Sequence, residues 1–182
     1  DPDLKLGTQD SPNRLRFARK LYGRELEVSR LRSIFERARE GRAGLVLITG
    51  DAGVGKSVLP SSLQTVFKES SGYFASGKFD RYRSEIPYAG LVTALDSLAD
   101  QLLKEPDRDL VQIRTRLEAA LGNIAGVIVG LVPDLALILP DAASVPAVGP
   151  METTQRLALA VIRFVEALAT RQNPLVLFLD DF

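Results

Sequence analysis

The first half of the chain alternates between amphipathic stretches and short apolar runs. Between residues 24 and 40, apolar residues recur mostly at three and four positions, which predicts an amphipathic helix. LVLIT, residues 45–49, is apolar throughout and predicts a short strand. Residues 56–69 predict a helix, which the interior Pro60 should kink or shorten. GYFASGKF, residues 72–79, predicts the second strand.

The second half is mostly helical and ends in an apolar strand. We expect helices at about 88–104, 108–121, 123–131 and 152–171, a proline-containing loop at 139–150, and a buried strand in LVLFLDDF, residues 175–182. Strands interleaved with helices imply a parallel α/β sheet with crossover connections. We expect residues from about 86 to 150 to form a helical insertion between the second and the last strand of this sheet.

Composition restricts the chemistry available to this chain. A length of 182 residues with 46% hydrophobic content suits one domain with one core. Lys plus Arg and Asp plus Glu both number 23, so no basic excess argues for nucleic acid as a partner. The chain has no Cys and no His, which excludes thiolate and imidazole chemistry and leaves groups suited to phosphate and Mg²⁺.

The ends and the most apolar stretch define the expected organisation. Residues 1–20 lack an apolar period and predict a linker, so the domain is expected at 21–182. The chain begins with Asp1 and has no signal-peptide pattern, so we expect a cytoplasmic piece of a longer protein. The apolar run 126–140 contains Pro133 and is shorter than the roughly 20 residues that a membrane span needs, so it predicts buried helix or an interface.

A phosphate-binding motif follows the first predicted strand. GDAGVGKS, residues 50–57, matches the pattern G-x-x-x-x-G-K-[ST] between a strand and a helix. In this pattern backbone N–H groups face the phosphates, the Lys56 amine reaches the β and γ phosphates, and the Ser57 hydroxyl binds Mg²⁺. The residues expected at the nucleotide are Gly50, Asp51, Ala52, Gly53, Val54, Gly55, Lys56, Ser57 and Val58.

The final strand ends on two carboxylates. In nucleoside triphosphatases with such a loop, a second apolar strand ends in an acid that holds Mg²⁺, usually beside the strand that carries the loop. We therefore expect Asp180 to orient Mg²⁺ through its water shell and Asp181 to polarise the attacking water. Strand 175–182 should lie beside strand 45–49.

Charged residues also gather at the end of the second predicted strand. These are Lys78, Asp80, Arg81, Arg83 and Glu85. They could face the nucleotide or a partner, but a solvated charged turn is the favoured interpretation.

Four segments together resemble the STAND class of AAA-like signalling ATPases. They are KLYGRE (20–25), LVLITGDAGVGKS (45–57, the Walker A segment), GYFASGKFDRYRSEIPYAGLVTAL (72–95) and LVLFLDDF (175–182, the Walker B segment). The similarity is strongest to the ATPase module of large proteins that join a serine/threonine kinase-like domain to a sensor histidine kinase. The chain departs from the family at two positions. It has Arg81 where the family usually has Gln, and it has Pro60 where the family seldom has proline.

The resemblance implies a switch that binds ATP or ADP with Mg²⁺ and is reset by slow hydrolysis. It places Tyr22, Gly23 and Arg24 beside the nucleotide and implies other domains of the same chain as partners, with oligomerisation possible. It also implies that a sensor strand and a helical lid follow Phe182, so that 21–182 is a partial P-loop ATPase domain cut after the Walker B strand. Alone, this piece should be inactive or very slow.

Three alternatives stay open. A motor or remodelling ATPase would work by continuous turnover, and an interaction module would hold a structural nucleotide. A GTP-binding switch is less favoured, but it stays open because the guanine-reading N-K-x-D, absent here, would lie after the second acidic strand. Competition between ATP and GTP would separate the two.

Overall fold

A computed structural model describes residues 23–51, 53–62, 71–79, 88–144, 146 and 149–181. The predicted linker 1–20, Tyr22 and Ala52 lie outside the described residues, as do 80–87 with most of the charged cluster. The elements in chain order are α1 (Glu25–Arg39), α2 (Val58–Ser62), β1 (Tyr73–Lys78), α4 (Ala89–Leu102), α5 (Asp107–Leu121), the 3-10 turn η2 (Gly122–Ile124), α6 (Ala125–Leu131), the 3-10 turn η3 (Pro133–Leu137), α7 (Pro150–Leu168) and β2 (Leu175–Asp180).

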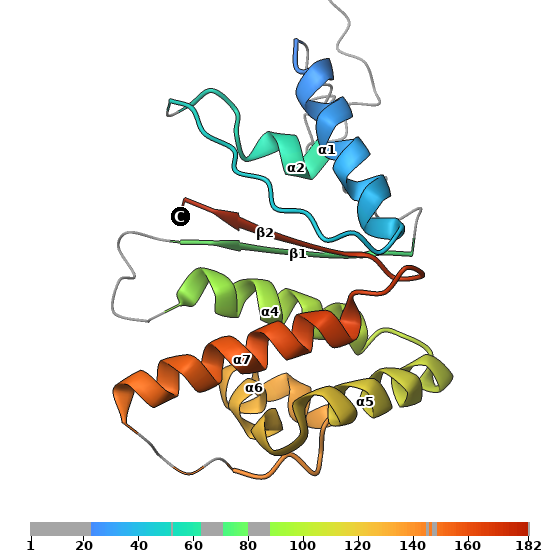
Figure 1. Ribbon diagram of the computed structural model, residues 1–182, viewed down its shortest axis with the longest axis vertical. Coiled ribbons are helices and arrows are strands. Elements are labelled where there is room, and N and C mark those ends of the chain that lie inside the picture. The colour runs from blue at the N-terminus through green and yellow to red at the C-terminus, as the bar shows by residue number, and fades with distance from the viewer. Residues whose placement is uncertain are drawn as a thin grey trace, which may run out of the picture.

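The two described strands form a parallel pair with helices on both faces. β1 and β2 are in register from Tyr73 opposite Leu175 to Lys78 opposite Asp180, which confirms the predicted parallel arrangement. In Figure 1, α1 and α2 lie on one side of the strands, whereas α4 lies on the other side with α5, α6 and α7 beyond it. On the α1 side, Phe35 packs against Phe74 and Val176.

The core lies between β1 and the helices of the second half. Side chains of α4, α5, α6 and α7 are buried together, and the largest that are fully enclosed include Leu95, Leu98, Leu117, Ile128 and Phe164. Their helical spacing is the pattern from which these helices are predicted, so the predictions for 88–104, 108–121, 123–131 and 152–171 are confirmed to within a few residues.

The apolar run 126–140 is core rather than an exposed patch. Ile128, Val132, Leu135 and Ile138 are buried, whereas Leu137 is 68% exposed. Within the described residues, no helix has both the length and the apolar character to cross a bilayer.

The strand predicted at 45–49 is wrong. This segment has no strand structure, and the side chains of Leu45 and Leu47 are 98% and 85% exposed. A strand requires a neighbour that satisfies its N–H and C=O groups, and in the described residues β2 pairs with β1, not with 45–49. The expected adjacency of 45–49 and the final strand is therefore also wrong as a strand pairing.

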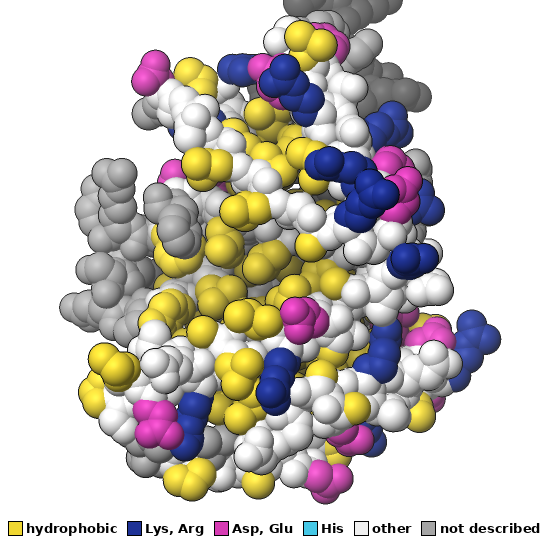
Figure 2. All heavy atoms as spheres, viewed as in Figure 1, with side chains coloured by type: hydrophobic (Ala, Val, Ile, Leu, Met, Phe, Trp, Pro, Cys, Tyr) yellow, Lys and Arg dark blue, Asp and Glu magenta, His cyan; other side chains and the backbone are white. Residues whose placement is uncertain are grey.

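The final strand exists, but it is not buried as predicted. All six residues of β2 are half-exposed, and Asp181 lies beyond the strand. Figure 2 shows hydrophobic side chains gathered across the middle of the viewed face, at the level of the strands in Figure 1. The apolar side chains of β2 are thus only partly covered by the rest of the described structure.

Pro60 occupies a favourable place instead of an interior one. Because α2 begins at Val58, Pro60 lies in the first helical turn, where backbone N–H groups have no partner within the helix. The proline therefore removes no hydrogen bond within the described turn, and its side chain is buried. The predicted kink or shortening of the helix stays a prediction. Residues 63–70 of the predicted helix lie outside the described residues.

Candidate nucleotide site

The glycine-rich loop leads directly into α2. Gly53 and Gly55 have φ of +81° and +84°, values that side chains with a Cβ rarely adopt. The Val58 N–H then donates to the Gly55 carbonyl at 3.1 Å, and the Leu59 N–H to the Lys56 carbonyl at 3.2 Å. The two glycines therefore make the turn from which the short helix begins.

The Lys56 ammonium joins the two ends of its own loop. Its Nζ donates to the carbonyl oxygens of Gly50 and Asp51, both at 2.8 Å. This holds a positive charge over the segment whose backbone is expected to surround phosphates. A phosphate oxygen can accept from the same ammonium in place of either carbonyl.

Arg24 connects the start of α1 to the loop. One guanidinium nitrogen donates to the Val54 carbonyl at 3.2 Å, and another lies 3.1 Å from Glu27 Oε1. A hydrogen bond from its own backbone and the Arg24 guanidinium lower the pKa of Glu27, which keeps the pair charged. The Gly23 N–H donates to Glu25 Oε1 at 3.2 Å. The Arg24 side chain thus contacts the loop, whereas the hydrogen bond of Gly23 stays at the start of α1. That the two residues lie beside a nucleotide stays a prediction.

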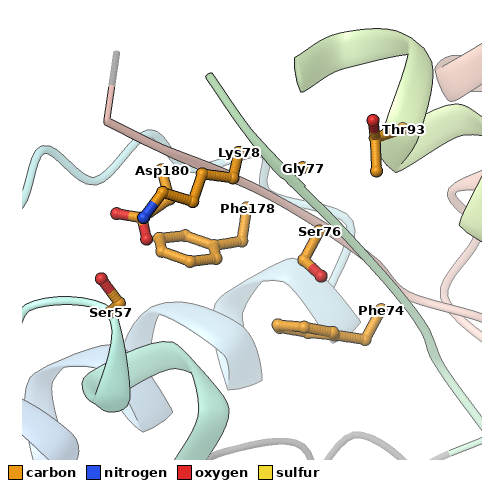
Figure 3. Close-up of a pocket in the computed structure, with 8 residues that line it drawn as sticks. All are labelled: Ser57, Phe74, Ser76, Gly77, Lys78, Thr93, Phe178 and Asp180. Carbon is orange, nitrogen blue, oxygen red and sulfur yellow. The ribbon is translucent and has the colours of Figure 1, made fainter. Parts of the chain in front are cut away.

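A cavity of about 300 Å³ brings the loop and the final strand together (Figure 3). Ser57 lines it from the loop and Asp180 from the end of β2, so the two predicted Mg²⁺ ligands share one cavity although 123 positions separate them. Phe74 and Phe178 supply apolar walls. The remaining lining residues are Ser76, Gly77, Lys78 and Thr93.

The two terminal acids are held in different ways. Asp180 is the last residue of β2 and lies opposite Lys78 in the register. Asp181 follows with a left-handed φ of +56°, and its N–H donates to Asp180 Oδ1 at 3.1 Å. The Asp181 carboxylate lies 3.0 Å from Lys78 Nζ. The Asp181 carboxylate thus meets a cation at the edge of the cavity, whereas the Asp180 carboxylate accepts a backbone N–H.

Lys78 is the described residue of the charged cluster, and the sequence interpretation did not place it at the site. It lines the cavity and pairs with Asp181, while its side chain stays 67% exposed as expected for a solvated charge. The signal was the strand alternation, which puts positions 74, 76 and 78 of β1 on one face. That face is also the one on which Phe178 and Asp180 lie opposite Ser76 and Lys78.

The donor set fits Mg²⁺ bound together with phosphate. In the part of the chain that the structure describes, no group of three or more Asp, Glu, His or Cys residues could hold a metal. Mg²⁺ at phosphate sites usually takes one or two protein ligands and completes its shell with water and phosphate oxygens. The Ser57 hydroxyl is a ligand of this kind, and the Asp180 carboxylate can accept hydrogen bonds from water bound to the cation.

Two comparisons match the chain to known proteins. The profile of the family described as AAA ATPase domain matches residues 20–182. The "Hybrid signal transduction histidine kinase G" of Dictyostelium discoideum is 33% identical over 182 residues, which is 99% of this chain and 5% of that relative. The chain therefore spans about a twentieth of the relative's length. No solved structure matches the chain.

Proposed function

Because the chain belongs to the AAA ATPase domain family and is homologous to part of a hybrid signal transduction histidine kinase, we propose that it is an ATP- and Mg²⁺-binding regulatory switch module of a multidomain signalling protein. Slow hydrolysis of ATP in the full-length protein resets the switch. The observation that carries the proposal is the cavity shared by Ser57, next to the phosphate loop's lysine, and Asp180.

Each group of the loop has a separate task in this proposal. Lys56 exchanges its carbonyl partners Gly50 and Asp51 for oxygens of the β and γ phosphates. Backbone N–H groups between Gly50 and Ser57 bind the same phosphates at the start of α2. Arg24 donates to the Val54 carbonyl, and this hydrogen bond keeps the turn at Gly23 linked to the loop when a nucleotide is bound.

The metal neutralises phosphate charge and orients the β and γ oxygens when it is bound. The Ser57 hydroxyl would hold the cation, and the Asp180 carboxylate would accept hydrogen bonds from water bound to it. Asp181 accepts the proton of the attacking water. The Phe74 and Phe178 side chains exclude water from one wall of the cavity, which strengthens these charged interactions.

The relative's name supports the signalling part of the proposal. A module of this size inside a much longer kinase would transmit its nucleotide state to other domains of the same chain, which we propose to be kinase-like and sensor-kinase domains. The direct partners would therefore be the nucleotide and these neighbouring domains, in the cytoplasm.

The test is nucleotide binding by wild-type and Lys56→Ala protein, measured by calorimetry with MgATP. Loss of the ammonium should weaken binding at least tenfold, because Lys56 is the loop's own cation for the phosphates. Lys104→Ala is the matched control, since Lys104 is exposed near the end of α4. Unchanged affinity in Lys56→Ala would overturn the proposed function.

A further inference from the structure

An ion pair joins the ends of the two strands at the cavity. Lys78 Nζ, from the last residue of β1, lies 3.0 Å from Asp181 Oδ2, just beyond β2. Other ion pairs, such as Arg24 with Glu27 and Arg156 with Glu152, join neighbours on one helix. The Lys78 pair instead fixes a side chain of one strand to the residue that follows another.

This pair contributes little to the stability of the fold. The two side chains are 67% and 50% exposed, and water and salt screen ion pairs that are as exposed as this one. Its effect is therefore on the position of the Asp181 carboxylate. That carboxylate belongs to a residue with a left-handed backbone, φ +56°, which is uncommon for a residue other than glycine.

A hydrogen bond and an ion pair both act on the position of Asp181. Its N–H donates to Asp180 Oδ1, which fixes the backbone, and Lys78 binds Oδ2, which fixes the side chain. Lys78 also lines the cavity with Ser57 and Asp180, and in Figure 3 its side chain lies on the same side of the strands as theirs. The lysine therefore ties the second acid to the cavity that contains the first.

We propose that Lys78 is a positioning residue that holds the Asp181 carboxylate at the edge of this cavity for hydrolysis of a nucleoside triphosphate. The inference rests on the proposed function. In the step, the water oxygen bonds to the γ phosphorus, and the bond from that phosphorus to the bridging oxygen breaks, leaving its electron pair on the diphosphate. The water proton passes to Asp181.

Position matters here because proton acceptance requires the carboxylate within hydrogen-bond distance of the water. Without Lys78, the Asp181 carboxylate loses the ion pair at Oδ2, which holds this half-exposed side chain toward the end of β1. The lysine acts through Asp181, so its removal should reduce the rate of the chemical step and leave nucleotide affinity unchanged.

The experiment uses the full-length protein and measures kcat for ATP hydrolysis and the Kd for MgATP. Lys78→Met removes the charge and retains a similar length, and we expect kcat to fall about tenfold with Kd unchanged. Lys78→Arg keeps the ion pair and should recover most of the rate. Lys104→Met, at an exposed lysine outside the cavity, is the control and should match wild type.

A double-mutant cycle tests whether Lys78 works through Asp181. In an Asp181→Asn background, Lys78→Met should cause no further loss of kcat. The proposal is overturned by a normal kcat in Lys78→Met, by an equal loss in both backgrounds, by a rise in Kd instead of a fall in kcat, or by hydrolysis that does not depend on Asp181.

The two proposals fail separately. If Lys56→Ala retains full MgATP binding, the proposed function is wrong. If Lys56→Ala loses binding and Lys78→Met hydrolyses ATP normally, the site is a nucleotide site in which Lys78 has no positioning role.

Discussion

Gly77 of β1 lies directly against the carbonyl oxygen of Gly90 in the first turn of α4, with no room for a Cβ on Gly77. Gly90 in turn faces the ring of Phe79, at 2.8 Å from the position of a Cβ. These two glycines bring helix and strand into close approach just below the cavity that Gly77 lines. This contact therefore fixes the distance between α4 and the end of β1, where Lys78 lies.

We expect Gly77→Ala to destabilise the fold by about 3 kcal/mol, because the new methyl group would overlap backbone that cannot rotate away. Chemical denaturation measures the loss. Gly130→Ala is the matched control: a Cβ there meets nothing within 4 Å, and α6 should gain about 0.5–1 kcal/mol from the better helix former. Equal effects of the two substitutions would contradict this account of the contact.

Gln101 protects the outer edge of β1. Its side-chain oxygen accepts the Phe74 N–H at 3.2 Å, and its amide nitrogen donates to the Phe74 and Ser97 carbonyls, each at 2.9 Å. Gln101→Leu should lower the free energy of unfolding by about 2 kcal/mol, since partly buried backbone groups lose their partners. Gln155→Leu, on the exposed side of α7, should stay within about 0.5 kcal/mol. A similar loss in both variants would show that the amide pairing is unimportant.

The helical half of the fold could be predicted from the sequence because each helix carries its own signal. Apolar residues at three and four positions define α4, α5 and α7 without information about their neighbours. The strand at 45–49 failed for the opposite reason. Apolar character is local, but a strand exists only with a hydrogen-bonded neighbour, and in the described residues LVLIT has none of strand type.

The site shows the same division. Ser57 and Asp180 could be proposed as partners because each belongs to a motif of fixed spacing, and the structure places both at one cavity. The pairing of Lys78 with Asp181 could not be predicted, because it depends on the register of two strands about 100 residues apart. The Gln101 contact with Phe74 was invisible for the same reason, since no spacing rule connects a helix side chain to a distant strand edge.

Asp96 makes the fold sensitive to pH. Desolvation, and then the charges of Asp134 and Asp100, raise the pKa of Asp96 above its ordinary value. The folded protein therefore binds this proton more strongly than the unfolded chain does. The charged carboxylate lowers the free energy of unfolding at neutral pH, and protonation at lower pH removes this loss. Asp96→Asn should stabilise the protein at pH 7 by less than about 1 kcal/mol, because the side chain is exposed and screened.

The difference between Asp96→Asn and wild type should shrink as the pH falls from neutral toward the ordinary aspartate pKa, and it should be absent below that pKa. Denaturation of both proteins across pH 3–7 measures it. A gain that stays constant with pH would mean that the charge of Asp96 is not its source.

Asp180 and Ser57 should control the Mg²⁺ dependence of nucleotide binding. Asp180→Asn still accepts the Asp181 N–H, so the strand end is preserved, but the neutral amide attracts the cation's water shell more weakly. We expect affinity for MgATP to fall about tenfold in Asp180→Asn and in Ser57→Ala, whereas affinity for ATP in the presence of a chelator stays unchanged. Ser76→Ala removes another hydroxyl of the same cavity, on β1 and away from the loop, and should leave both affinities unchanged.

Titrations with and without Mg²⁺ separate these cases. If Ser57→Ala and Asp180→Asn weaken binding equally in both conditions, the two residues bind the nucleotide or shape the cavity, and the metal lies elsewhere.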